Sequence, residues 1–247
     1  MKGNDLNISL YNDDCFKVMK DLIDSGIKFD AIITDPPYGM TACKWDSQFD
    51  LEKWWNLIHQ LIKKDGNVCI FSKQPFTTTL NASNIKEYKY EIIWEKQQAT
   101  APMCAKKRIM PIHENISIFY KKLGTYNPQM RYGFNNYSGF FDENKKIGEI
   151  YQAKSAHREC NDGSRYPISV VKYSNVRKSL HPTQKPLELV KWLIKTYTNE
   201  GDTVFDPFMG SGTTGVACKE LNRGFIGVEL DGNYFKSAKE RIDARKD

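Results

Sequence analysis

The sequence predicts an α/β fold in which a mostly parallel sheet is flanked by helices and carries a loop-rich insert. Three observations support this class. Strand-like and helix-like segments alternate in the first third and the last quarter of the chain, two buried strands run directly into turn motifs, and the middle of the chain shows no clear period. Alternation of strands and helices is typical of a parallel sheet covered on both faces.

The first part of the chain contains eight expected elements. In chain order they are a strand at 8–11, a helix at 15–22, a buried strand at 30–34, a helix at 51–62, a turn at 65–67, and strands at 68–71, 90–94 and 116–120. Apolar residues recur at helical spacing within 51–62, which indicates one face packed against the sheet.

The last quarter repeats the alternation, with a helix at 187–197, a strand at 203–205, a helix at 213–221, a strand at 225–228 and a helix at 233–242. Residues 121–178 instead are rich in Asn, Gly, Tyr, Lys and Arg. Long irregular segments inside compact domains are usually functional or disordered. We therefore expect one catalytic and cofactor-binding domain, residues 1–120 and 179–247, with a target-recognition insert at 121–178.

Composition limits the class of protein. The chain has 247 residues, 40% apolar and 13% aromatic, which predicts a packed globule. Its apolar stretches are too short to span a bilayer, and the N-terminus lacks the apolar core of a signal peptide. The six cysteines form no C-x-x-C pair and the four histidines are scattered, so no metal site is predicted. We expect a cytoplasmic protein without membrane contact.

Positive charge is concentrated in the middle of the chain. The net charge is +6, but residues 105–195 hold 17 Lys and Arg against 7 Asp and Glu, a net charge of +10. The remainder is slightly acidic. A basic region of this kind is typical of a surface for a polyanion such as nucleic acid, although an ordinary solvated surface has the same composition.

A glycine-rich turn follows the strand at 203–205. Its sequence, Asp206-Pro-Phe-Met-Gly-Ser-Gly-Thr-Thr214, lets a ligand approach the backbone closely, and Glu229 ends the next strand, where a carboxylate can accept bonds from ribose hydroxyls. The turn lacks the third glycine of a dinucleotide site, and Asp206 would repel a pyrophosphate. S-adenosylmethionine carries ribose, an amino group and a sulfonium but no phosphate, so the charges favour it as the cofactor.

The second motif, Asp35-Pro36-Pro37-Tyr38, ends the strand at 30–34. The Asp35 carboxylate and the Pro36 carbonyl can accept the two N–H bonds of an exocyclic amino group and expose its lone pair to a methyl donor. Pro36 and Pro37 stiffen the backbone, and Tyr38 offers a face for stacking the base. A base inside a duplex must be flipped out to reach such a site.

At these two motifs the sequence resembles the β-class of amino-DNA methyltransferases, which have a Rossmann-like fold. The catalytic motif, the basic insert and the cofactor motif follow one another in the order of that class, and 181–186 (His-Pro-Thr-Gln-Lys-Pro) resembles its signature segment. The resemblance covers most of the chain except 121–178. Asp-Pro-Pro-Tyr is the form usual among N6-adenine enzymes, and the small size resembles stand-alone phage and prophage methylases.

The resemblance implies roles for individual residues. Asp14 and Cys15 match a Gly-Asp-Cys segment near the cofactor adenine, although Asp13 replaces the glycine here, and Thr183 and Lys185 are candidates to hold the methionine carboxylate. Glu229 is expected to hold the ribose. The expected cofactor loop consists of Asp206, Phe208, Gly210, Ser211, Gly212 and Thr213.

Double-stranded DNA is the expected partner of the basic region. The candidate DNA-binding residues are Lys106, Lys107, Arg108, Arg131, Lys145, Lys146, Arg158 and Arg165. Lys and Arg hold phosphates, and Arg also reads base edges. We expect either a restriction enzyme on a separate chain or no such partner. A homodimer is compatible with the resemblance.

Three functions therefore remain open at this point. The leading hypothesis is site-specific methylation of N6 of adenine. N4-cytosine methylation uses the same amino-group geometry, and a non-catalytic DNA-binding protein could retain the fold. The presence of Asp35, Tyr38, Asp206 and Glu229 favours an enzyme over the last alternative.

Overall fold

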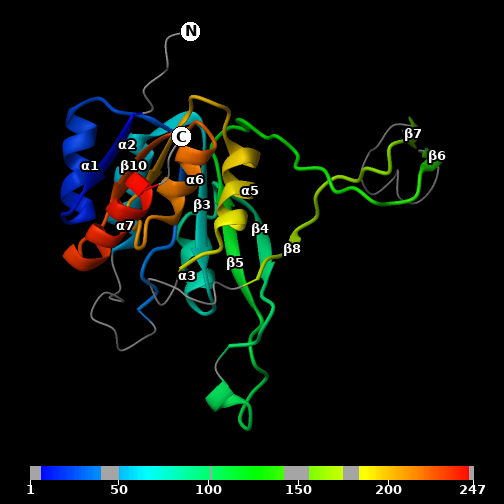
Figure 1. Ribbon diagram of the computed structural model, residues 1–247, viewed down its shortest axis with the longest axis horizontal. Coiled ribbons are helices and arrows are strands. Elements are labelled where there is room, and N and C mark those ends of the chain that lie inside the picture. Colours follow the sequence, from blue (N-terminus) through cyan, green and yellow to red (C-terminus); the bar gives the residue numbers. More distant parts are fainter. Residues whose placement is uncertain (1–6, 40–49, 101, 142–155, 175–183, 245–247) are drawn as a thin grey trace. The chain divides into compact units, whose positions relative to one another are not determined.

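The structure is a computed structural model that describes residues 7–39, 50–100, 102–141, 156–174 and 184–244 (Figure 1). Contacts divide the chain into two compact units. The first contains Met1–Asn127 and Ser169–Asp247, and the second contains Pro128–Ile168. Among the described residues, no helix is long and apolar enough to cross a membrane.

The first unit is built on an eight-stranded sheet. Its strands lie in the order β1 (Ile8–Tyr11), β10 (Gly224–Val228), β9 (Thr203–Asp206), β2 (Phe29–Thr34), β3 (Ile62–Ser72), β5 (His113–Phe119), β4 (Tyr88–Glu95) and β8 (Val170–Lys172). Pairing is parallel from β1 to β3, whereas β5 runs antiparallel to both β3 and β4. The predicted α/β class with a mostly parallel sheet is confirmed.

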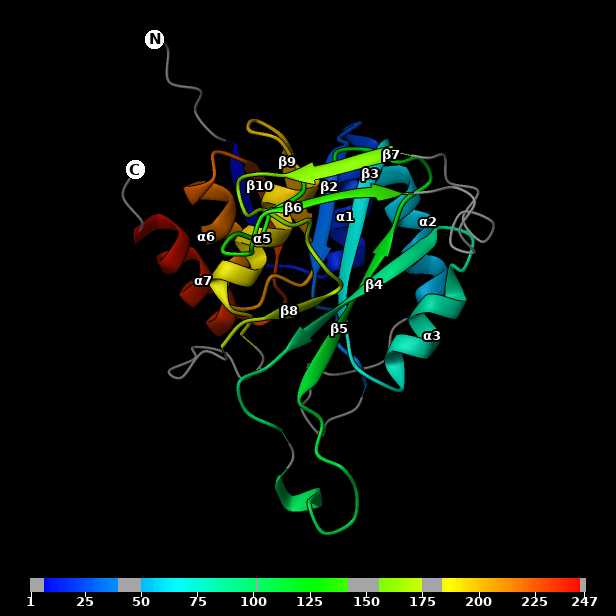
Figure 2. The same ribbon diagram turned by 90° about the vertical axis from the view of Figure 1, so that its right-hand side faces the viewer.

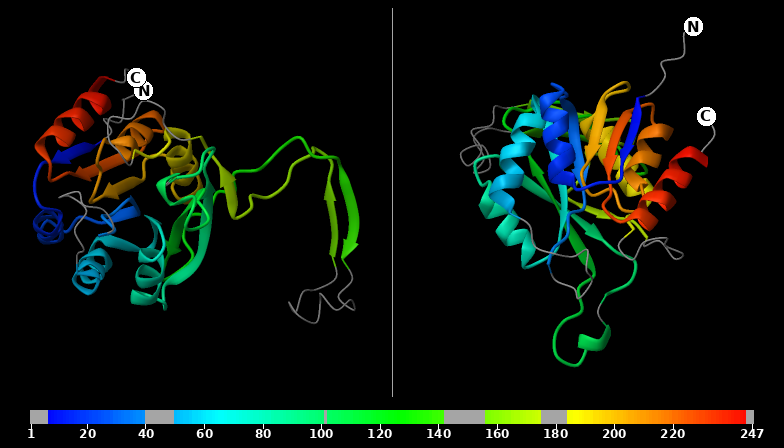
Figure 3. Two further views of the ribbon diagram at one scale, coloured as in Figure 1. Left: turned by 90° about the horizontal axis from the view of Figure 1, so that it is seen from below. Right: turned by 90° about the vertical axis from the view of Figure 1, so that its left-hand side faces the viewer.

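Helices cover both faces of this sheet, as the right-hand view of Figure 3 shows. The first group is α1 (Cys15–Asp24), α2 (Leu51–Leu61) and α3 (Phe76–Ser83), and the second is α5 (Leu187–Tyr197), α6 (Thr213–Glu220) and α7 (Gly232–Ala244). Successive residues of one strand point to opposite faces of the sheet and pack in different hydrophobic cores. In β2, Ile32 packs in the core with α1 and α2, while Ala31 and Ile33 pack in the core with α5 and α6.

One expected turn is wrong. Residues 65–67 belong to β3, which begins directly after α2 at Ile62. The pairing of β3 with β2 is irregular here, because Phe29 pairs with Ile62 and Ala31 already pairs with Asn67. Gly66 sits where a Cβ atom would lie 2.6 Å from the Ile62 side chain, so this glycine marks a close approach inside the strand.

Several elements have no clear periodic signal in the sequence. These are α3, the short 3₁₀ helix η1 (Pro102–Cys104), and the strands β6 (Tyr137–Phe141), β7 (Ala156–Cys160) and β8. Although β8 lies within 121–178, it pairs with β4 and so belongs to the main sheet. In the second unit, β6 and β7 form an antiparallel pair, with Tyr137 opposite Cys160.

Candidate active site

The two motifs meet because the strands that carry them are neighbours. Ala31 of β2 pairs with Val204 of β9 in parallel register, so the carboxyl ends of both strands lie at one edge of the sheet. Thr34 ends β2 and Asp206 ends β9. The Thr34 hydroxyl donates a hydrogen bond to Asp206 Oδ1 at 2.7 Å, which joins the two strand ends directly.

Asp206 is buried and accepts three hydrogen bonds. Besides Thr34, the Thr214 hydroxyl donates to Oδ2 at 2.7 Å and the Phe208 backbone N–H donates to Oδ1 at 3.1 Å. Burial raises the pKa of Asp206 to about 6, although these three donors favour the ionised form. The carboxylate is therefore held at the strand end by hydroxyl and backbone donors.

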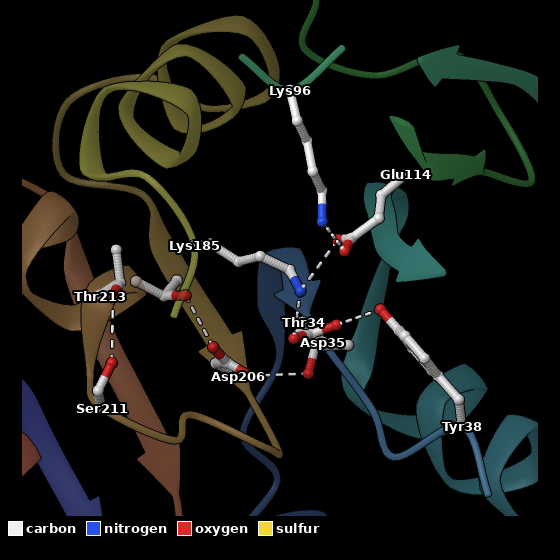
Figure 4. A network of polar contacts seen from close by, with 10 residues as sticks. Thr34, Asp35, Tyr38, Lys96, Glu114, Lys185, Asp206, Ser211 and Thr213 are labelled. Carbon is white, nitrogen blue, oxygen red and sulfur yellow. Dashed lines mark hydrogen bonds and ion pairs between the residues drawn. The ribbon is translucent and has the colours of Figure 1, made fainter. Parts of the chain in front are cut away.

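Asp35 is held from two sides. The Tyr38 hydroxyl donates to Oδ1, and the Lys185 ammonium pairs with Oδ2 at 2.5 Å (Figure 4). Burial raises the pKa of Asp35, and the positive charge of Lys185 opposes that rise. Tyr38 also stacks on Phe76 at the start of α3, with ring centroids 5.3 Å apart, so its ring has a fixed orientation.

Lys185 continues into a second ion pair. Its Nζ lies 3.3 Å from Glu114 Oε2 of β5, and the other oxygen of Glu114 accepts from Lys96, which directly follows β4. Burial would raise the pKa of Glu114, but Lys185 and Lys96 together hold it below its ordinary value. The ammonium of Lys185 also lies 5.1 Å from the centre of the Phe71 ring.

A cavity of about 280 Å³ lies between the two strand ends. Its lining includes most of the predicted site residues: Asp14, Cys15, Asp35, Pro36, Pro37, Tyr38, Lys185, Asp206, Phe208, Gly210, Ser211, Thr213 and Glu229. Gly212 is not among the lining residues, and Thr183 lies outside the described residues. One cavity thus brings together residues from the beginning, middle and end of the chain.

The glycine turn has two residues with left-handed backbone. Gly210 has φ 51° and Gly212 has φ 73°. A Cβ atom on Gly210 would meet nothing within 4 Å, whereas one on Gly212 would lie 3.0 Å from the Cβ atom of Ala238 in α7. Gly210 therefore leaves its backbone accessible to a ligand, and Gly212 permits α7 to pack closely against the turn.

Acidic groups at the rim of the cavity already have partners within the chain. Glu229 accepts from the backbone N–H groups of Gly210 at 3.0 Å and Asp231 at 2.9 Å, and burial raises its pKa. The Asp14 carboxylate accepts from Lys17 N–H and so caps α1. Burial raises the pKa of Cys15 to about 12, which keeps its thiol neutral.

A family model described as a DNA methylase, for N6 and N4 methyltransferases, matches residues 29–240. The chain belongs to this DNA methylase family. The predicted family and the predicted class of enzyme are therefore confirmed. The matched span contains both motifs, Lys185 and Glu229.

The methylase is also similar to individual relatives. It is 30% identical to the type II methyltransferase M.HpaI of Haemophilus parainfluenzae, over 92% of this chain and 72% of that protein. It is 27% identical to the DNA adenine methyltransferase YhdJ of Escherichia coli K12, over 98% and 84%. A crystal structure of an M1.HpyAVI–SAM complex has a TM-score of 0.68 and 31% identity, over 96% and 99% of the two chains.

The sequence did not indicate several residues of this methylase site. Thr34, Phe76, Lys96 and Glu114 lie outside the recognised motifs, and each takes its partner from a distant part of the chain. Lys96 directly follows β4 and Glu114 is the second residue of β5, and both strands contain other charged or polar residues, such as Glu91 in β4 and Asn115 in β5. That pattern by itself names no partner.

The predicted DNA-binding residues are distributed over both units. Lys106, Lys107 and Arg108 are exposed on the segment between β4 and β5, which extends away from the sheet (Figure 2). In the second unit, the Arg131 and Arg165 guanidinium groups lie 5.0 and 5.6 Å from the ring centre of Phe134. Arg158 belongs to β7, and Lys145 and Lys146 lie outside the described residues.

Proposed function

We propose that this methylase transfers the methyl group of S-adenosylmethionine to N6 of an adenine flipped out of double-stranded DNA. The observation that carries the proposal is the single cavity at which Asp35-Pro36-Pro37-Tyr38 and the turn after Asp206 meet. The relatives named above include an adenine methyltransferase and a structure solved with SAM.

The lining of the cavity fits S-adenosylmethionine. Its ammonium and sulfonium groups are cationic, and the carboxylates of Asp14, Asp206 and Glu229 lie in the lining. The open backbone at Gly210 admits close approach of a ligand. We expect Glu229 to hold the ribose, Asp14 to lie near the adenine, and Thr183 and Lys185 to hold the carboxylate. When bound, the cofactor supplies an electrophilic methyl group on sulfur.

The residues of the chain position the accepting amino group. Asp35 and the carbonyl of Pro36 accept its N–H bonds, which turns the nitrogen lone pair toward the methyl carbon. In the transfer, the nitrogen would bond to the methyl carbon as the carbon–sulfur bond breaks, the sulfur would leave as a neutral thioether, and the excess proton on nitrogen would pass to Asp35, which already accepts its N–H bond. Tyr38, held by Phe76, provides the face on which the flipped base stacks. This mechanism depends on proximity and alignment.

Duplex DNA is the expected substrate, and its flipped base must enter this cavity from the surface of the protein. Lys106, Lys107 and Arg108 are exposed, and residues 97–113 contain no Asp or Glu. The strand pairing places both ends of this segment at the catalytic edge of the sheet. We therefore expect these cations to meet phosphates beside the target base. A homodimer, a separate restriction enzyme and a cytoplasmic location stay predictions.

The experiment that tests the proposal is expression in bacteria that lack DNA methylation, followed by long-read sequencing that detects modified bases. We expect N6-methyladenine at one short recurring sequence, and no modification with the Asp35→Ala variant. N4-methylcytosine would contradict the choice of adenine. An unmodified genome, from a protein shown to fold and to bind the cofactor, would favour the non-catalytic alternative.

A further inference from the structure

Four charged side chains of alternating sign lead away from the cavity. They are Asp35 after β2, Lys185 before α5, Glu114 in β5 and Lys96 after β4 (Figure 4). Asp35 and Lys185 line the cavity, whereas Glu114 and Lys96 are not among the lining residues. The chain of charges thus connects the catalytic motif with the end of β4 and the start of β5.

This arrangement is buried. The side chains of Lys96, Glu114 and Lys185 are 10%, 12% and 9% exposed, and that of Asp35 is 19% exposed. Buried charges are costly unless each has an opposite partner, and the four groups together are electrically neutral. The two inner members each have two partners of opposite charge. Lys185 pairs with Asp35 and Glu114, and Glu114 accepts from Lys96 with one oxygen while its other oxygen lies 3.3 Å from Lys185.

The sharing of Lys185 has a consequence for Asp35. If Lys185 paired with Asp35 alone, its full positive charge would act on the carboxylate that must accept the amino N–H bonds. We propose that Glu114, which is also ion-paired with Lys96, is a positioning residue that shares Lys185 with Asp35. This sharing keeps Asp35 a stronger hydrogen-bond acceptor than it would be if Lys185 paired with Asp35 alone. This inference rests on the proposed function, since it assigns Asp35 the same role.

The electrostatics of Asp35 agree with this geometry. Burial raises its pKa, Lys185 lowers it, and Glu114 raises it. The other titratable groups that face it are Tyr38, whose hydroxyl lowers the pKa, and Asp206, whose own pKa is raised in part by Asp35. Removing the charge of Glu114 therefore lowers the pKa of Asp35, and removing that of Lys185 raises it. The two changes have opposite signs.

A purely structural role for the pair predicts something different. Lys96 and Glu114 stand at the two ends of the segment 97–113, and their ion pair could serve only to close that segment at its base. In that case, loss of Glu114 would lower stability without moving the pH dependence of methyl transfer. The pH profile of kcat separates the two roles.

The experiment compares Glu114→Gln with wild type, using the full chain, S-adenosylmethionine and a duplex that carries the target sequence. We expect the acid limb of the kcat profile to move to lower pH by about one unit, and kcat on the plateau to fall about threefold to tenfold, because a less basic acceptor is a weaker one. Lys185→Met moves the acid limb to higher pH.

The matched control is Glu220→Gln. Glu220 of α6 is also a largely buried carboxylate with a lysine partner, Lys191 of α5, and neither residue lines the cavity. We expect its pH profile to match that of wild type. A second variant, Glu114→Gln with Lys96→Met, removes the charge of Glu114 while the remaining pair of Asp35 and Lys185 stays neutral, and its acid limb should also move to lower pH.

Several results would overturn the inference. An acid limb in Glu114→Gln that coincides with wild type and Glu220→Gln, or one that moves to higher pH, contradicts it. Failure of both Glu114 variants to fold, judged by circular dichroism, would assign the pair a structural role alone. If wild type itself methylates no DNA, the proposed function fails; if wild type is active and only the predicted shift is missing, the inference alone fails.

Discussion

Thr34 donates a hydrogen bond to Asp206 at 2.7 Å, so the residue before the catalytic motif contacts the first residue of the cofactor turn. The two lie in adjacent parallel strands, and 172 positions separate them in the sequence. The pairing of β2 with β9 brings the two halves of the site together, and this bond joins the ends of the two strands. The two motifs lie side by side because both follow the carboxyl ends of adjacent strands at the same edge of one sheet.

Asp35→Ala should abolish methyl transfer while cofactor binding is retained. The variant loses the carboxylate that accepts the amino N–H, and we expect kcat to fall by at least about 10²–10³-fold, the usual cost of losing one preorganised polar group. Radiolabelled methyl transfer and calorimetric binding of the cofactor measure the two effects. Full activity in this variant would contradict the mechanism.

Asp206→Asn should make the protein more stable at neutral pH but weaken cofactor binding. The pKa of Asp206 is about 6 in the folded chain against 3.8 for the ordinary group. The folded chain therefore binds more protons between these values, and the free energy of unfolding falls as the pH rises from about 4 to 6. At pH 7 we expect the variant to gain about 1–3 kcal/mol in urea unfolding.

The pH dependence of this gain is the sharper measurement. Below about pH 4 the wild-type carboxyl is protonated in both states, so wild type and Asp206→Asn should have similar free energies of unfolding. Asp24→Asn, at an exposed carboxylate of α1, serves as the control and should show no such difference. A gain that is the same at every pH would argue against a raised pKa.

The two glycines of the turn should differ when each is replaced by alanine. Gly212→Ala brings a Cβ atom to 3.0 Å from Ala238 at φ 73°, and we expect a loss of about 2–4 kcal/mol from strain and overpacking. Gly210→Ala adds a Cβ atom in open space at φ 51° and should cost about 1 kcal/mol. Since Gly210 lines the cavity, its variant should bind the cofactor more weakly. Equal losses of stability would show that packing against α7 is unimportant.

Replacing Lys106, Lys107 and Arg108 together with alanine should weaken DNA binding and reduce its salt dependence. Each lost phosphate contact lowers the slope of log K against log salt by about 1, so a reduction of up to about 3 is expected. Fluorescence anisotropy with a labelled duplex at several salt concentrations measures the slope. A variant with alanine at the exposed residues Lys20, Lys236 and Lys239 is the control. An unchanged slope in the first variant would remove this segment from the DNA interface.

Local patterns predicted most elements of the first unit. The helices α1, α2, α5, α6 and α7 and the strands between them have apolar residues at the spacing that burial requires. The turn expected at 65–67 was wrong because β3 tolerates an irregular register there, which depends on β2 rather than on its own residues. The sequence likewise did not indicate α3, whose residue Phe76 acquires its role only through Tyr38.

The sequence by itself determined the fold class, the two strand-end motifs and the family, because each of these depends on residues close together in the chain. Only the tertiary structure decided which charges meet. Lys185 pairs with Asp35 from 150 positions away, and Glu114 joins them because β5 lies between β3 and β4. Pairing between distant charges depends on the order of the strands in the sheet, which no local pattern of residues specifies.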